Sequence, residues 1–96
     1  MAELPVANGA PVGPHRLKTR HQRGSILEFQ DRSRWEISPG HEIFTNHWAP
    51  ESDITIVPGG FPEYPYDLIN PKSGDRVPAR FCGNAESVAR WRLIDH

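Results

Sequence analysis

Short stretches of alternating apolar and polar residues recur about ten residues apart along the chain, and Pro, Gly, Asp or Asn ends each one. Residues 53–57 are the clearest example, because β-branched and polar side chains alternate there. The stretches do not alternate with helices as they do in β-helix-β folds. The pattern predicts an all-β fold, a small antiparallel barrel or rolled sheet of five or six strands. The predicted strands cover residues 15–21, 26–30, 34–38, 53–57, 66–70 and 76–81.

The chain of 96 residues has room for a single domain. Residues 1–14 are rich in Ala, Pro, Gly and Asn without periodicity, so we expect a flexible N-terminal arm. Residues 15–96 are then one small barrel-like domain that ends in a short helix or strand. The choice between the two stays open, because Asn84 could cap a helix over 85–93 while apolar residues also alternate over 89–93.

Residues 26–38 carry the strongest hairpin pattern, with a turn-forming Asp-Arg-Ser segment at the centre. We expect Glu28 and Glu36 to be cross-strand neighbours on the outer face, with Arg34 offsetting their repulsion. The alternation turns four apolar side chains toward the core: Leu27, Phe29, Trp35 and Ile37.

The segment after this hairpin has roughly helical spacing over residues 39–48. Ser38 could cap a short helix, and Phe44 and Trp48 are expected to pack on the core. Further along, Pro78 interrupts an alternating stretch and cannot donate a backbone hydrogen bond to a ladder. It therefore predicts that residues 76–81 form an edge strand.

Composition excludes several classes of protein. A single cysteine, Cys82, cannot form an internal disulfide, and the N-terminus lacks the basic and apolar regions of a signal peptide, so we expect a cytoplasmic protein. No apolar run approaches the roughly 18 residues of a membrane span, so no membrane partner is expected. The net charge of −1 argues against a general nucleic-acid binder, which would be strongly basic.

An ordered set of residues between about 24 and 80 resembles a group of small uncharacterised bacterial proteins. The group has a hairpin ending in a Trp-Glu-hydrophobic strand, then a Trp before an Asp-hydrophobic strand, then an Asn at a turn containing Gly. The resemblance implies a β-barrel-like fold and a bacterial-type protein, and it implies no activity. It is carried by Gly24-Ser25-Ile26, Asp31-x-Ser33-x-Trp35-Glu36-Ile37, Trp48, Asp53-Ile54-x-Ile56 and Tyr64-Pro65-Tyr66-x-Leu68-Ile69-Asn70.

Catalytic and metal motifs do not stand out, so we expect neither an enzyme nor a bound metal or cofactor. The sequence lacks the G-x-S-x-G serine motif, and Cys82 fits a small buried apolar role at least as well as a nucleophilic one. A ligand or enzyme site around His47, Trp48 and Tyr66 is a third possibility. The histidines show no zinc-binding spacing: His15, His21, His41, His47 and His96.

Two segments are candidates for binding a partner. Pro58-Gly59-Gly60 is expected to end a strand, and the proline-rich loop after it carries three aromatic residues that either anchor a partner or fold back on the core: Phe61, Tyr64 and Tyr66. Near the N-terminus, three basic residues alternate along a predicted strand and a fourth follows it: Arg16, Lys18, Arg20 and Arg23. Acidic residues gather instead in the second half: Glu51, Asp53, Glu63, Asp67 and Asp75.

We therefore predict a non-catalytic protein-interaction module that binds a protein partner or a second copy of itself through these two segments. The alternative is a small barrel that binds RNA or single-stranded DNA with the basic strand of residues 16–23 and stacking aromatics.

Overall fold

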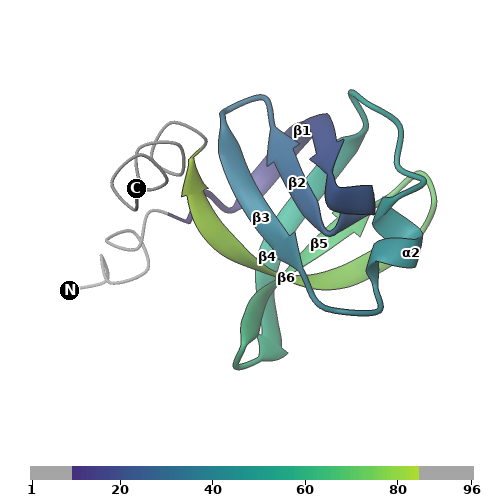
Figure 1. The fold of residues 1–96 in the computed structure, drawn as a ribbon. Coiled ribbons are helices and arrows are strands. Elements are labelled where there is room, and N and C mark those ends of the chain that lie inside the picture. Colours follow the sequence, from purple (N-terminus) through teal and green to yellow (C-terminus); the bar gives the residue numbers. More distant parts are fainter. Residues whose placement is uncertain (1–9, 85–96) are drawn as a thin grey trace, which may run out of the picture.

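The computed structural model describes residues 10–84 and shows six antiparallel strands that close into a barrel (Figure 1). The predicted all-β fold is confirmed, with six strands rather than five. A 3-10 turn, η1 (Gln22–Gly24), and one short helix, α2 (Glu42–Thr45), interrupt the strands. The strands are β1 (Gly13–His21), β2 (Ile26–Phe29), β3 (Ser33–Ile37), β4 (Asp53–Phe61), β5 (Tyr64–Asn70) and β6 (Asp75–Asn84).

The barrel consists of two three-stranded units in the order β1-β2-β3-β6-β5-β4, and β1 pairs with β4 to close the ring. Within each unit the strands follow one another through short turns. Asp31 makes the β2–β3 turn, because its Oδ1 accepts from the Ser33 backbone N–H at 2.9 Å and from the Ser33 hydroxyl at 2.6 Å. Asn70 does the same at the β5–β6 turn, where its Oδ1 accepts from the Lys72 N–H at 3.0 Å.

The core lies inside the barrel and includes the four side chains predicted to face inward from the first hairpin. Trp35 is fully buried, and its Nε1 donates to Ser33 Oγ at 3.1 Å, so its polar atom has a partner. Burying each large side chain contributes about 1.5–3 kcal/mol. The buried apolar residues are Leu17, Leu27, Phe29, Trp35, Ile37, Trp48, Ile54, Ile56, Leu68, Val77 and Ala79.

The segment between β3 and β4 packs differently from the prediction. Trp48 is buried as expected, but Phe44 is 42% exposed, and the neighbouring Thr45 is buried in its stead. Thr45 fits because its hydroxyl donates to the buried carbonyl of Gly24 at 2.5 Å. The residue before the helix is His41 and not Ser38, so the expected cap was also wrong.

Pro78 does not mark an edge strand, because the barrel has none: β6 pairs with β3 on one side and β5 on the other. The proline is tolerated since the β3 ladder ends with Ile37 opposite Ala79. Beyond that point Ser38 N–H still donates to the Pro78 carbonyl at 2.9 Å, and no strand residue requires a donor from Pro78.

The predicted aromatic loop is a projecting hairpin. β4 runs on through Pro58-Gly59-Gly60 to Phe61, so the expected strand end was wrong, although the β4–β5 register is irregular between Pro58 and Phe61. The β1–β4 ladder begins with Gly13 opposite Ile56, and residues 57–61 therefore extend past the described part of β1. Figure 1 shows this hairpin extending beyond the rest of the barrel.

Predictions can be compared with the structure only within residues 10–84. β1 begins at Gly13, two residues before the predicted start at residue 15. The predicted helix or strand after Asn84 and most of the predicted arm lie outside the described residues. Within residues 10–84, no helix is long and apolar enough to cross a membrane.

Candidate partner-binding groove

A groove of about 460 Å³ lies between the tip of the β4–β5 hairpin and the segment that joins β3 to α2. Residues 61–64 form the hairpin wall, and Ser38, Pro39 and His41 form the wall opposite. Pro78 of β6 completes the lining. Prolines and aromatic rings dominate this surface, which is the composition of sites that hold apolar groups.

One of the exposed large apolar side chains lines the groove, and two more follow His41 in the sequence. Among residues 10–84, the large apolar side chains that are exposed are Val12, Ile43, Phe44 and Phe61. Phe61 lines the groove and is 59% exposed, while Ile43 and Phe44 lie on α2, directly after His41. Isolated exposed apolar residues are common on soluble proteins, but a group beside a concave surface indicates an interaction site.

The groove also contains polar atoms without protein partners. His41 Nδ1 is buried and makes no hydrogen bond, which is costly for a polar atom removed from water. Glu63 lies in the turn at the hairpin tip, and its carboxylate makes no ion pair within residues 10–84. A ligand in this groove could therefore pair with the exposed Glu63 carboxylate.

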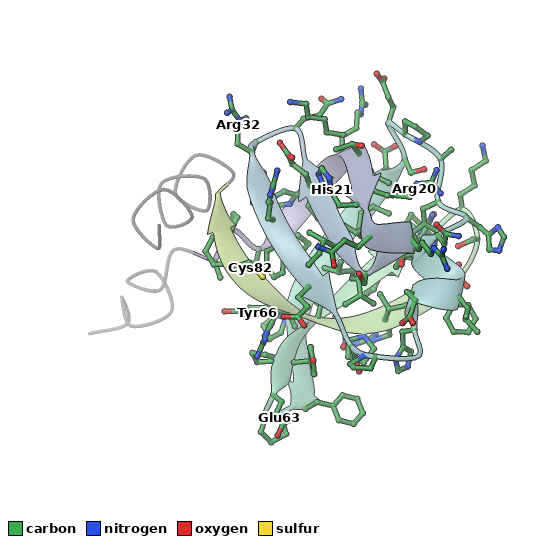
Figure 2. All side chains as sticks on the ribbon, in the orientation of Figure 1. Arg20, His21, Arg32, Glu63, Tyr66 and Cys82 are labelled. Carbon is green, nitrogen blue, oxygen red and sulfur yellow. The ribbon has the colours of Figure 1, made fainter. Side chains whose placement is uncertain are left out.

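The three aromatic residues predicted to meet a partner have three different environments. Phe61 is exposed at the groove. Tyr64 is half-buried, and the Arg80 guanidinium carbon lies 5.5 Å from its ring centre. Tyr66 is folded back, with its ring 5.3 Å from that of Trp35. In Figure 2, Tyr66 lies at the base of the hairpin and Glu63 at its tip.

The basic residues predicted as a second contact surface form a row along β1 but do not all share one face, because the β1–β2 register shifts between Leu17 and Thr19 and places Arg20 opposite the core residue Leu27. Arg16, Lys18 and Arg20 are exposed, and Leu17 between them is buried. Their charges are partly paired, since Arg16 lies 3.5 Å from Asp53 and Arg20 donates to the Asn46 carbonyl. Arg23 departs from this row, because it belongs to η1 and has a positive φ of 59°.

Glu28 contacts Lys18 and two other basic side chains, His21 and Arg34, on the outside of the barrel. Its carboxylate lies 3.2 Å from Arg34, 3.3 Å from His21 and 3.7 Å from Lys18, although Glu28 is only 5% exposed. Burial by itself raises the pKa of Glu28, but the His21 hydrogen bond and the Arg34 and Lys18 charges outweigh it and lower the pKa below 4.5.

The expected Glu28–Glu36 pair does not form. The register places Glu28 opposite Arg34 and Ile26 opposite Glu36. Glu36 instead lies 2.6 Å from Arg80 on the neighbouring strand β6. The prediction assumed the wrong register: in the β2–β3 ladder the two glutamates lie two positions apart.

Charge divides the barrel into two halves. Residues 13–37 hold six Lys or Arg against three Asp or Glu, and residues 38–84 hold three against six. Because β1, β2 and β3 are neighbours in the ring, as are β6, β5 and β4, each excess lies on its own side. Figure 2 shows Arg20, His21 and Arg32 at the end of the view opposite Glu63.

The histidines, acidic residues and cysteine of the described part of the chain are possible metal ligands, and Cys82 is also a possible nucleophile. No three His, Cys, Asp or Glu side chains there come close enough to hold a metal ion. Cys82 is exposed, so the predicted buried role was wrong. Desolvation and the Glu36 charge raise the pKa of its thiol, which disfavours the nucleophilic thiolate near neutral pH.

Trp48 and Tyr66, suggested as parts of one ligand site, make separate contacts with different residues. Trp48 Nε1 donates to Asp75 Oδ2 at 2.9 Å, whereas Tyr66 packs on Trp35. The Trp48 hydrogen bond, and a second from Ser73, lower the pKa of Asp75, so this carboxylate stays ionised. These two contacts connect parts of the barrel, and Trp48 itself belongs to the core.

Comparison of the chain with protein-family profiles, with curated protein sequences and with solved structures finds no match. Function is therefore inferred from the groove itself. The sequence pointed to Phe61 and Tyr64 but missed His41 and Pro39, which had been assigned only to a connecting segment. The adjacent apolar residues Ile43 and Phe44, both exposed on α2, are the sequence signal that lies nearest to this wall.

Proposed function

We propose that the protein is a non-catalytic interaction module and that it binds an extended segment of a protein partner in the groove between the β4–β5 hairpin and the β3–α2 connection. One observation carries the proposal: Phe61, an exposed ring on a projecting hairpin, faces a concave apolar surface in which His41 Nδ1 has no partner. Aromatic anchors beside desolvated pockets are the usual sites of strong protein contacts.

The surrounding surface supports a protein segment over a small molecule. Beyond the groove lining, Ile43 and Phe44 are exposed on α2, and the Phe44 ring centre lies 6.3 Å from that of His41 in the groove wall. A small ligand would fill the groove and leave this surface in water, whereas a polypeptide segment could cover both.

The mode of binding follows from the strand pairing. A closed barrel offers no free edge for a partner to join as an extra strand. The hairpin beyond the barrel carries Pro58 in β4 and Pro65 in β5, and prolines there remove backbone donors that strand addition would use. The partner segment is therefore recognised through its side chains.

Selection of random peptides displayed on phage, with the full-length chain as bait, tests the proposal. We expect peptides that bind wild type and bind Phe61→Ala at least about 30-fold more weakly, the effect of losing about 2 kcal/mol at a central contact. Val12→Ala is the matched control, because Val12 is also 52% exposed and lies outside the groove lining. Peptides that bind both variants equally well, or no selected peptide at all, would refute the proposal.

A second candidate is binding of single-stranded nucleic acid, which the exposed row of Arg16, Lys18 and Arg20 on β1 favours. The exposed Phe61 ring lies apart from these basic residues, because the hairpin tip extends past Gly13 at the N-terminal end of β1. This separation places the stacking ring away from the basic row and ranks the candidate second.

Fluorescence polarisation of a labelled oligonucleotide, measured from low to moderate salt, tests the second candidate. Binding that weakens with salt and is lost in Arg16→Ala plus Arg20→Ala would support it. Arg76→Ala, on the acidic half of the barrel, is the control.

A further inference from the structure

We propose that the segment held in the groove is cationic as well as apolar, with an apolar side chain next to a Lys or Arg. The inference rests on the proposed function of the groove and names the chemistry of its partner. Four features support it: the charge in the groove lining, the charges around the groove, the position of Phe61 relative to Glu63, and the contact that Tyr64 already makes.

Glu63 is the one formally charged residue of the groove lining. It is exposed in the two-residue turn of the hairpin, and it makes no ion pair with the other residues between 10 and 84. Glu63 also borders a second hollow of about 280 Å³ on the hairpin, which includes Pro65 and Phe81. A carboxylate at this tip can therefore meet a cation that approaches along the groove.

The charges around the groove do not offset Glu63. The nearby cations are already occupied, because Arg76 lies 2.8 Å from Asp67 and Arg80 lies 2.6 Å from Glu36. Glu42, next to His41, adds a second carboxylate, and it accepts a hydrogen bond from Gly40 N–H at 2.7 Å. The unpaired formal charge of the groove lining is therefore negative, which favours a cationic segment over an acidic one.

Phe61 and Glu63 both line the groove, so one long cationic side chain bound there could meet both. They are two residues apart around the same turn, one with an exposed ring and the other with a free carboxylate. An Arg side chain can lie along an aromatic ring while its guanidinium reaches a carboxylate. Tyr64 already makes such a contact with Arg80 in this hairpin.

Parallel peptide selections on the full-length wild type and on Glu63→Lys test the inference. We expect wild type to enrich peptides with Lys or Arg beside an apolar residue, and Glu63→Lys to bind those peptides at least 10-fold more weakly. Glu51→Lys is the matched control, because it makes the same charge change at an exposed residue outside the groove lining and should leave binding unchanged.

The failures of the two proposals are distinguishable. Peptides that need Phe61 but show no Lys or Arg preference, or that bind wild type and Glu63→Lys equally, overturn the cationic inference and leave the groove as the binding site. If the selected peptides bind Phe61→Ala as tightly as wild type, or if no peptide is selected, the proposed function is overturned as well. Circular dichroism of Glu63→Lys confirms that the variant is folded.

The chain itself contains the same chemistry in Arg90-Trp91-Arg92, so the test includes Trp91→Ala. We expect this variant to bind the selected peptides as wild type does. A gain in affinity of 10-fold or more would show that the chain's own residues compete for the groove, and it would overturn the assignment of the groove to an outside partner.

Discussion

The ring of Trp35 meets the ring of Tyr66 edge to face, with 5.3 Å between their centres and 85° between their planes. Trp35 is fully buried, and Tyr66 lies opposite Ala79 where the β4–β5 hairpin leaves the barrel. The contact joins the base of the hairpin to the core, while the tip stays in solvent. The base therefore supports the groove wall.

Tyr66→Ala should destabilise the fold, because it removes an aromatic contact to the core from a half-buried position. We expect the free energy of unfolding to fall by about 1–3 kcal/mol in urea denaturation. Tyr64→Ala is the control in the same strand, and it should cost less because Tyr64 is not packed against the core cluster. Equal losses in the two variants would contradict the assignment of Tyr66 to the fold.

Glu28→Gln should also destabilise the fold, by about 1–3 kcal/mol near neutral pH, because a buried carboxylate holds Arg34, His21 and Lys18 together. The folded-state pKa of Glu28 lies below its ordinary value of 4.5. Its contribution to stability is therefore present above the unfolded-state pKa and is lost as pH falls through the lower folded-state pKa.

Urea denaturation of wild type and Glu28→Gln across pH 3 to 7 measures this effect. The difference between the two proteins should be constant above about pH 5 and should shrink at lower pH. A difference that grows as the pH falls would contradict the favourable pairing of Glu28.

Gly24→Ala should cost more stability than an ordinary glycine substitution. Gly24 has φ +91°, and an added Cβ would lie 2.7 Å from the backbone nitrogen of Asn46, so α2 would have to move. Gly74→Ala is the matched control, since its φ of +84° gives similar strain with no atom within 4 Å. We expect about 1–3 kcal/mol for Gly74→Ala and a larger loss for Gly24→Ala, measured by thermal or urea denaturation.

Much of the barrel could be predicted from local pattern. The inward positions of Leu27, Phe29, Trp35 and Ile37 follow from alternation, and Asp31 signals its turn through side-chain hydrogen bonding to the backbone. The errors came from long-range structure. Pro78 predicted an edge strand, because the sequence does not show that the β3 ladder ends before it needs a donor from Pro78. The Pro-Gly-Gly run at 58–60 predicted a strand end, but pairing with β5 continues β4 to Phe61.

Only one wall of the groove, the β4–β5 hairpin, could be predicted from the sequence. The exposed Phe61 belongs to a segment with an evident aromatic and proline bias, and the sequence assigned it to binding. Its other wall depends on how the β3–α2 connection folds against the hairpin, and residues 41 and 61 meet there only after the barrel closes. Local spacing gives no sign of this arrangement, so the sequence alone places His41 in the connecting segment of residues 39–48 and does not relate it to Phe61.

The most direct test of the central claim is chemical-shift mapping of ¹⁵N-labelled full-length protein titrated with a peptide selected for Phe61-dependent binding. We expect the largest amide shifts at the two groove walls, at Ser38, His41, Phe61, Glu63 and Tyr64. Largest shifts along residues 16–23 of β1 and η1, with the groove amides unmoved, would contradict it.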